Sequence, residues 1–165
     1  MSPRAPTILA LDPGTDQTAW VHFDGARVLA HGMLPNPGML MSLRRWQLPA
    51  GELAVEMIAS YGMPVGASVF ETCVWIGRFV EAWASGGQAW RIVYRRDVKL
   101  ELCGDSRAKD KNIRQALLDR IGPQGRKGSP GPTYGLHGDE WAALGVAVTA
   151  GILARREAMT PAARR

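Results

Sequence analysis

An apolar run near the start of the chain ends on an aspartate and then breaks into a turn, since residues 8–15 read ILALDPGT. Four apolar residues followed by a Pro-Gly pair are typical of a short buried strand, because proline and glycine interrupt regular backbone pairing. A strand of this kind carries the carboxylate of Asp12 to the edge of a sheet. Taken alone, the pattern also fits an aspartate that only caps a turn.

Two further acidic positions adjoin apolar segments. Glu56 closes the run LAV at 53–55, and Asp139 and Glu140 open an apolar helical pattern. A half-buried carboxylate needs a partner, whereas acids in the first turn of a helix are favoured by the helix dipole alone. Carboxylates from separate segments are the ligands of hard cations such as Mg²⁺, and two ions about 3.5–4 Å apart suit phosphodiester cleavage. The joint pattern therefore predicts a metal-dependent nuclease.

The periodicity of the whole chain predicts one α/β domain over residues 1–165, with helices packed on a mixed sheet. The expected strands are 7–11, 18–23, 28–33, 52–58 and 91–94, the first three forming an antiparallel meander. The expected helices are 39–46, 67–85, 96–102, one capped by Asp105 or Ser106 and ending at 121, and 138–156. Residues 122–135, rich in glycine and proline, are expected to be a mobile loop, with flexible tails at 1–6 and 158–165.

Basic residues are clustered along the chain. There are 20 Lys and Arg against 15 Asp and Glu in total, but nine basic against five acidic residues between 91 and 120. Such clustering beside carboxylates favours a polyanionic substrate such as DNA, with ordinary solvated helix faces as the alternative. The two cysteines lack the spacing of a zinc or redox motif, and the first apolar run is too short for a signal peptide or membrane span. A cytoplasmic protein is expected.

Five segments, in this order, resemble the RuvC-type Holliday-junction resolvases of the ribonuclease H-like superfamily: ILALDPGT at 8–15, VE at 55–56, RDVK at 96–99, KDK at 109–111 and HGDEWA at 137–142. The resemblance covers nearly the whole chain. It implies a five-stranded sheet in which strands 1–3 are antiparallel and the later strands parallel. It also implies that Asp12 and Glu56 hold two Mg²⁺ ions, replaceable by Mn²⁺, and that His137 positions the attacking water.

The last acidic ligand is ambiguous. Glu140, three residues after His137, takes the place of the family's final acid, which is usually an aspartate, and this chain has a second acid, Asp139, directly before it. Successive helical residues point about 100° apart, so only one of the two can face the metals squarely. The spacing from the histidine favours Glu140, and Asp139 is retained as the alternative ligand.

By the same resemblance, the chain nicks four-way junctions and other branched DNA as a two-fold homodimer. Contacts with DNA are expected from Lys99, Lys109, Lys111, Arg95, Arg96 and Arg107, and from Tyr61 or Met63 as a wedge in the loop after Glu56. Helix 67–85 is the expected dimer contact, and a bacteriophage source is expected from the compact size. The alternatives are a same-fold nuclease for flaps, forks or RNA/DNA hybrids, and a catalytically silent junction-binding protein.

Overall fold

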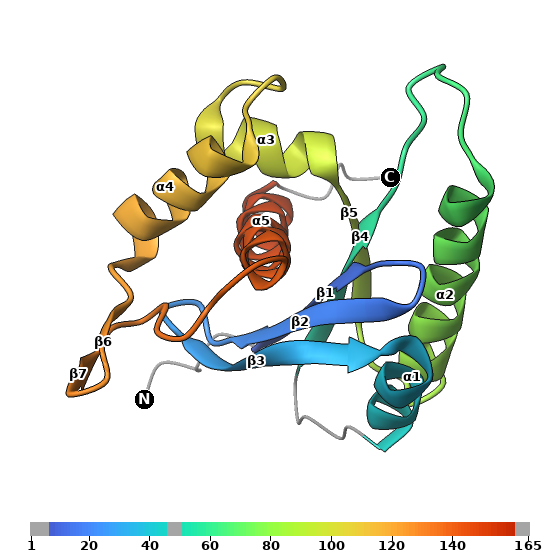
Figure 1. Ribbon diagram of the computed structural model, residues 1–165, viewed down its shortest axis with the longest axis horizontal. Helices are drawn as coiled ribbons and strands as arrows, with labels where there is room; N and C mark the ends of the chain where they lie inside the picture. Colours follow the sequence, from blue (N-terminus) through green and yellow to red (C-terminus); the bar gives the residue numbers. More distant parts are fainter. Residues whose placement is uncertain (1–6, 46–50, 161–165) are drawn as a thin grey trace.

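Five strands form one mixed sheet in the order β3-β2-β1-β4-β5, with β1 at its centre (Figure 1). The computed structural model describes residues 7–45 and 51–160. The strands are β1 Ile8–Pro13, β2 Gln17–Phe23, β3 Val28–Pro35, β4 Glu52–Met57 and β5 Trp90–Tyr94. β2 pairs antiparallel with β1 and β3, whereas β4 pairs parallel with β1 and β5. The predicted sheet is confirmed, and its strand ends differ from the prediction by two residues or fewer.

Helices cover both faces of this sheet (Figure 1). They are α1 Asn36–Arg45, α2 Ala67–Ala84, α3 Arg95–Cys103, α4 Asp110–Ile121 and α5 Glu140–Met159. α1 and α2 lie on one face and α5 on the other, with α3 and α4 packed against α5. Side chains of a strand alternate between faces, so Leu9 and Leu11 pack with α1 and α2 while Ile8 and Ala10 pack with α5.

Helix α5 is buried on nearly all sides over its first half, from Glu140 to Ala150. Small residues allow this close packing, because a Cβ at Gly145 would come 3.1 Å from Val98 Cγ1 on α3. The predicted apolar stripe is therefore part of a wider buried surface. Burial on both the sheet side and the α3 side holds the start of α5 in one place, directly beside the ends of the central strands.

Three segments differ from the sequence prediction. α4 begins at Asp110 instead of after residues 105–106, because the Asp105 carboxylate accepts the Arg107 N–H in a separate turn and Asn112 Oδ1 accepts the Lys109 N–H at the true helix start. Residues 122–135, predicted as a mobile loop, contain a short hairpin of β6 Gly125–Arg126 and β7 Ser129–Pro130. α1 also starts earlier than predicted, at Asn36, and the predicted helix end at Trp46 lies outside the described residues.

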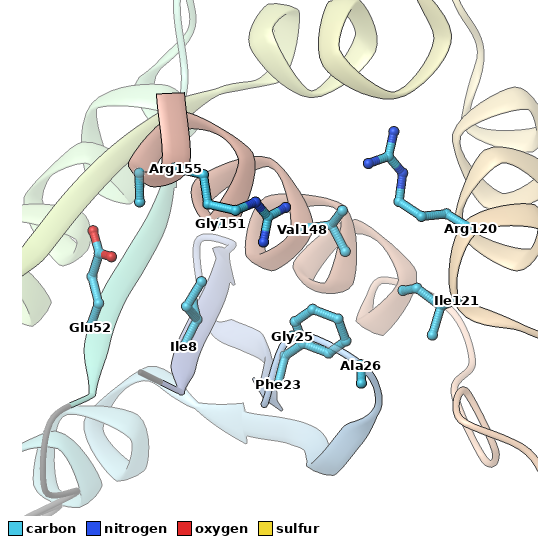
Figure 2. A pocket seen from close by; sticks show the side chains of 11 residues that line it. Ile8, Phe23, Gly25, Ala26, Glu52, Arg120, Ile121, Val148, Gly151 and Arg155 are labelled. Atoms are coloured by element: carbon cyan, nitrogen blue, oxygen red, sulfur yellow. The ribbon is translucent and has the colours of Figure 1, made fainter. Parts of the chain in front are cut away.

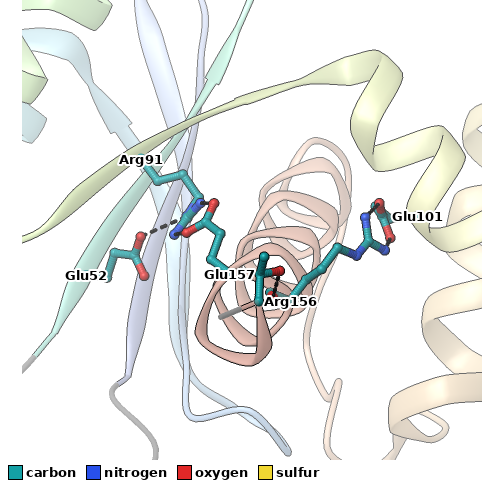
Figure 3. A network of polar contacts seen from close by, with 6 residues as sticks. Glu52, Arg91, Glu101, Arg156 and Glu157 are labelled. Atoms are coloured by element: carbon teal, nitrogen blue, oxygen red, sulfur yellow. Dashed lines mark hydrogen bonds and ion pairs between the residues drawn. The ribbon is translucent and has the colours of Figure 1, made fainter. Parts of the chain in front are cut away.

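The last turns of α5 are tied to the rest of the fold by ion pairs (Figure 3). Glu157 pairs with Arg91, which also contacts Glu52 at 2.9 Å, and Arg156 pairs with Glu101 at 2.8 Å. The helix therefore extends to Met159, past the start of the tail predicted at 158. The predicted tail 1–6 and residues 161–165 lie outside the described part. No helix among the described residues is long and apolar enough to cross a membrane.

Candidate metal centre

The geometry of the sheet brings Asp12 and Glu56 together. β1 and β4 are neighbouring parallel strands in which Leu11 lies opposite Val55, so the next residue of each strand lies at the same level. Leu11 and Val55 face α1 and α2. Because the side chains of a strand alternate between its two faces, those of Asp12 and Glu56 point to the α5 face. Glu56 is buried and Asp12 is half-buried. Two carboxylates that are far apart in the sequence thus meet at one edge of the sheet, as predicted from the two strand patterns.

The electrostatics show how close these carboxylates are. Burial, the negative charge of Glu56, a hydrogen bond to Glu56 and the charge of Asp139 raise the pKa of Asp12 to about 8, and among the described residues Arg95 alone acts to lower it. At neutral pH Asp12 therefore keeps its proton and donates it to Glu56. A cation placed here would relieve this repulsion, so the donor set suits a hard divalent ion.

Asp139 is the third carboxylate near Asp12, and Asp12, Glu56 and Asp139 are called the acidic cluster here. No three His, Cys, Asp or Glu side chains of the described residues are close enough together to hold a metal ion as they stand. Asp139 lines a cavity of about 120 Å³ together with Asp12, and it also lines the groove along the turn that follows β1. Ala142, one helical turn further on, faces the same cavity without a charged group. The sequence favoured Glu140 as the ligand at this end of α5, but the side chain that the structure brings beside Asp12 is that of Asp139.

Glu140 points into a different environment. Its side chain is only 3% exposed, and its Oε2 accepts the backbone N–H of His137 at 3.1 Å. The same oxygen lies 2.9 Å from Nδ1 of His137 and 2.9 Å from Nδ1 of His31 on β3. Glu140 therefore fixes the loop before α5 to the sheet. The imidazole of His137, predicted to position water, is mostly exposed, contacts Glu140 and lines neither cavity at Asp12.

Arg95, expected to contact DNA, lies inside the cluster. Its Nη1 is 3.4 Å from Glu56 Oε1, and its Nη2 bonds Oδ1 of Asp110 at the start of α4. Arg95 and Asp110 both line the cavity with Asp12. Asp110, His31 and Arg114 were not predicted as site residues. The guanidinium of Arg114 lies 4.7 Å from the centre of the Trp141 ring, and both residues line the cavity. The only sequence signal for Asp110 was its place in the KDK segment.

The other predicted DNA contacts lie on the outer elements. Arg107, Lys109 and Lys111 gather around an open cavity at the start of α4, while Lys99 and Arg96 lie on α3. Tyr61 and Met63 are 61% and 70% exposed on the loop between β4 and α2, which projects beyond the sheet (Figure 1). Arg107, Lys109 and Lys111 thus flank the start of α4, whose first residue Asp110 lines the cavity at Asp12, and the loop with Tyr61 and Met63 begins at the end of β4, just after Glu56.

A larger cavity, of about 450 Å³, lies at the opposite end of β1 (Figure 2). Ile8 and Phe23 line it from the sheet and Val148 from α5, and the guanidinium of Arg155 extends between them (Figure 2). None of the predicted site residues lines it. The acidic cluster and this apolar cavity are thus separate features of the molecule.

Comparison of the sequence with protein families found no match, and comparison with curated proteins found none either. Solved structures are similar in shape. A Thermus thermophilus RuvC structure is 19% identical with a TM-score of 0.64, covering 92% of this chain and 96% of that one. T. thermophilus RuvC in complex with Holliday junction substrate is 14% identical with a TM-score of 0.67 and the same coverage. The protein therefore has the fold of RuvC.

Proposed function

We propose that the protein is a metal-dependent endonuclease that nicks four-way junctions and other branched DNA. The observation that carries this proposal is that Asp12 and Glu56 lie side by side at the ends of two parallel strands, with Asp139 lining the same cavity as Asp12, on a RuvC fold. Carboxylates crowded until one cannot ionise at neutral pH are a recurrent mark of a catalytic or metal-binding site. The solved relative bound to a Holliday junction supports the choice of substrate.

In this proposal Asp12, Glu56 and Asp139 hold Mg²⁺, with Mn²⁺ as a substitute. The bound ions would supply a hydroxide at neutral pH and neutralise charge on the phosphate. Asp12 gives up its proton on loading, and Glu140 keeps the loop before α5 in place so that Asp139 faces the cavity. Basic side chains bind the phosphates on either side of the scissile bond and give affinity without sequence readout.

Two coordinated nicks require two copies of the chain. Phe70 and Val74 lie one turn apart on α2 and are each 63% exposed, so this helix presents an apolar strip away from the sheet. Large exposed apolar side chains that adjoin one another often mark a protein contact. We assign this strip as the homodimer contact, in agreement with the prediction for helix 67–85, with Tyr61 and Met63 on the adjoining loop directed at the junction.

The test is cleavage of labelled DNA by the wild-type protein with Mg²⁺ at one fixed salt concentration. A mobile four-way junction, a flap, a fork, an RNA/DNA hybrid and a plain duplex are compared, with Asp12→Asn as the inactive control. The proposal expects the junction to be nicked fastest and Asp12→Asn to bind it within about threefold of wild type without cutting, since phosphate contacts remain. Preference for the flap, fork or hybrid would instead identify a same-fold nuclease with another substrate.

Junction binding without cleavage is the second candidate function. Two observations favour it: the guanidinium of Arg95 already contacts Glu56, and Ala142 contributes no charge to the cavity. Wild-type protein that binds the four-way junction but leaves it intact with both Mg²⁺ and Mn²⁺ would support this candidate.

A further inference from the structure

Arg95 occupies its place because of the register of the sheet. It is the first residue of α3 and follows β5 directly, and β5 pairs with β4 so that Val93 lies opposite Glu56. The chain leaving β5 therefore passes the end of β4, where the carboxylate of Glu56 lies. A long side chain at position 95 reaches this carboxylate from the neighbouring strand.

The two partners of the Arg95 guanidinium are unequal. The distance to Glu56 Oε1, 3.4 Å, is at the long limit of a hydrogen bond, and the guanidinium also donates a hydrogen bond to Asp110 Oδ1. Glu56 is buried, but the side chain of Asp110 is 83% exposed and free to follow the guanidinium. The contact with Glu56 is thus the one that can be released while the contact with Asp110 is kept.

The guanidinium also acts on the rest of the acidic cluster. It lines the cavity together with Asp12 and Asp139, and its positive charge opposes the effect of the carboxylates on Asp12. A divalent ion bound by Asp12 and Glu56 would place like charge next to it. The positive charge that compensates Glu56 in the metal-free protein is therefore the charge that hinders metal loading.

We infer that Arg95 is a positioning residue that competes with the metal ion for Glu56, and that loading releases its guanidinium from Glu56 while the contact with Asp110 is kept. The inference rests on the proposed metal centre. It assigns to Arg95 a role different from the phosphate contact expected from the sequence, and it gives Asp110 a role in metal loading without making it a ligand.

The test measures Mn²⁺ affinity by calorimetry on the full chain, without DNA. Arg95→Gln should bind Mn²⁺ about tenfold more tightly or better, because a competing charge within a few ångströms is removed. Arg95→Lys keeps the charge and should remain close to wild type. Arg96→Gln is the matched control, since it removes the same charge from the next, exposed position, and its affinity should not change.

Asp110 distinguishes competition from direct ligation. Asp110→Asn removes the alternative partner of Arg95, so it should weaken Mn²⁺ binding, whereas Arg95→Gln/Asp110→Asn should bind as tightly as Arg95→Gln alone. If Asp110 were a ligand, the double variant would be weaker than Arg95→Gln. Thermal melting in EDTA should show a lower midpoint for Arg95→Gln, because Glu56 loses its compensating charge.

The two proposals fail separately. Unchanged or weaker Mn²⁺ binding by Arg95→Gln, in a protein whose Asp12→Asn variant has lost binding, would overturn the competition and leave the metal centre intact. Mn²⁺ binding that survives Asp12→Asn would overturn the metal centre itself. If Arg95→Gln does not fold, Asp110→Asn and Arg95→Lys still test the inference, since Mn²⁺ binding by Asp110→Asn that equals wild type, or by Arg95→Lys that differs from it, would overturn the competition.

Discussion

Replacing Asp12 by asparagine should stabilise the metal-free protein even though it removes a proposed metal ligand. The pKa of Asp12 rises from 3.8 to about 8 on folding, chiefly because of burial and then because of Glu56. Between these values the unfolded chain carries an ionised carboxylate and the folded chain a protonated one. The contribution of Asp12 to the free energy of unfolding is therefore fully present below pH 3.8 and is lost as the pH rises toward 8.

The magnitude follows from the same shift. At pH 7 the unfolded group lies about three pH units above its pKa, which corresponds to a loss of about 4 kcal/mol as an upper value. Asparagine resembles the protonated carboxyl in shape and can still donate a hydrogen bond to Glu56, but it needs no proton. Asp12→Asn should recover most of this loss at pH 7 and little of it at pH 4.

The assay is urea denaturation in EDTA at several pH values between 4 and 8, for wild type, Asp12→Asn and Asp16→Asn. Asp16 is an exposed acid in the turn after β1 and serves as the control, with no pH-dependent gain expected. With Mn²⁺ at 100 times the Kd the difference between the two proteins should shrink by about 2.7 kcal/mol, because only the wild type gains binding energy. An Asp12→Asn variant less stable than wild type at pH 7 in EDTA would refute the reasoning.

Three further predictions concern the ions, the start of α5 and the dimer. Mn²⁺ affinity of the wild type should increase with pH up to about 8, with proton release detectable by calorimetry in buffers of different ionisation enthalpy, because loading must displace the proton of Asp12. Asp139→Asn should weaken Mn²⁺ binding and leave the melting midpoint nearly unchanged. Glu140→Gln should cost about 1.5–3 kcal/mol of stability with little effect on Mn²⁺ binding, since Glu140 accepts a hydrogen bond from the loop before α5 and does not face the cavity. Phe70→Ser/Val74→Ser should elute as a monomer and nick the two strands of a junction independently, as size exclusion and a supercoiled cruciform substrate would show.

Part of the site could be predicted from the sequence because it depends on local patterns. The alternation along β1 and β4 determines which face each residue takes, so an apolar strand that ends on an acid predicts where the acid will lie. The order of β1 and β4 in the sheet came from the family resemblance. Asp12 and Glu56 were placed beside each other by these two steps, and their adjacency is what the sheet register shows.

The choice between Asp139 and Glu140 depended on contacts that no local pattern contains. Glu140 is held by His31, which belongs to β3 and lies far away in the sequence. The three-residue spacing between His137 and Glu140 does bring these two side chains into contact with each other. It does not direct either of them toward Asp12. In the same way, the pairing of Arg95 with Asp110 requires the crossing of α3 and α4, which periodicity cannot specify.

Crowding of acids at this edge of the sheet should destabilise the fold, and the contacts of Arg95 and Glu140 show how the destabilisation is limited. Arg95 compensates Glu56 from one side, and the backbone of the loop before α5 compensates Glu140 from the other. What remains uncompensated is Asp12, which stays protonated. Asp12, on the central strand, is thus the acid that the fold accommodates only in its neutral form, and a bound cation that allowed it to ionise would stabilise the fold.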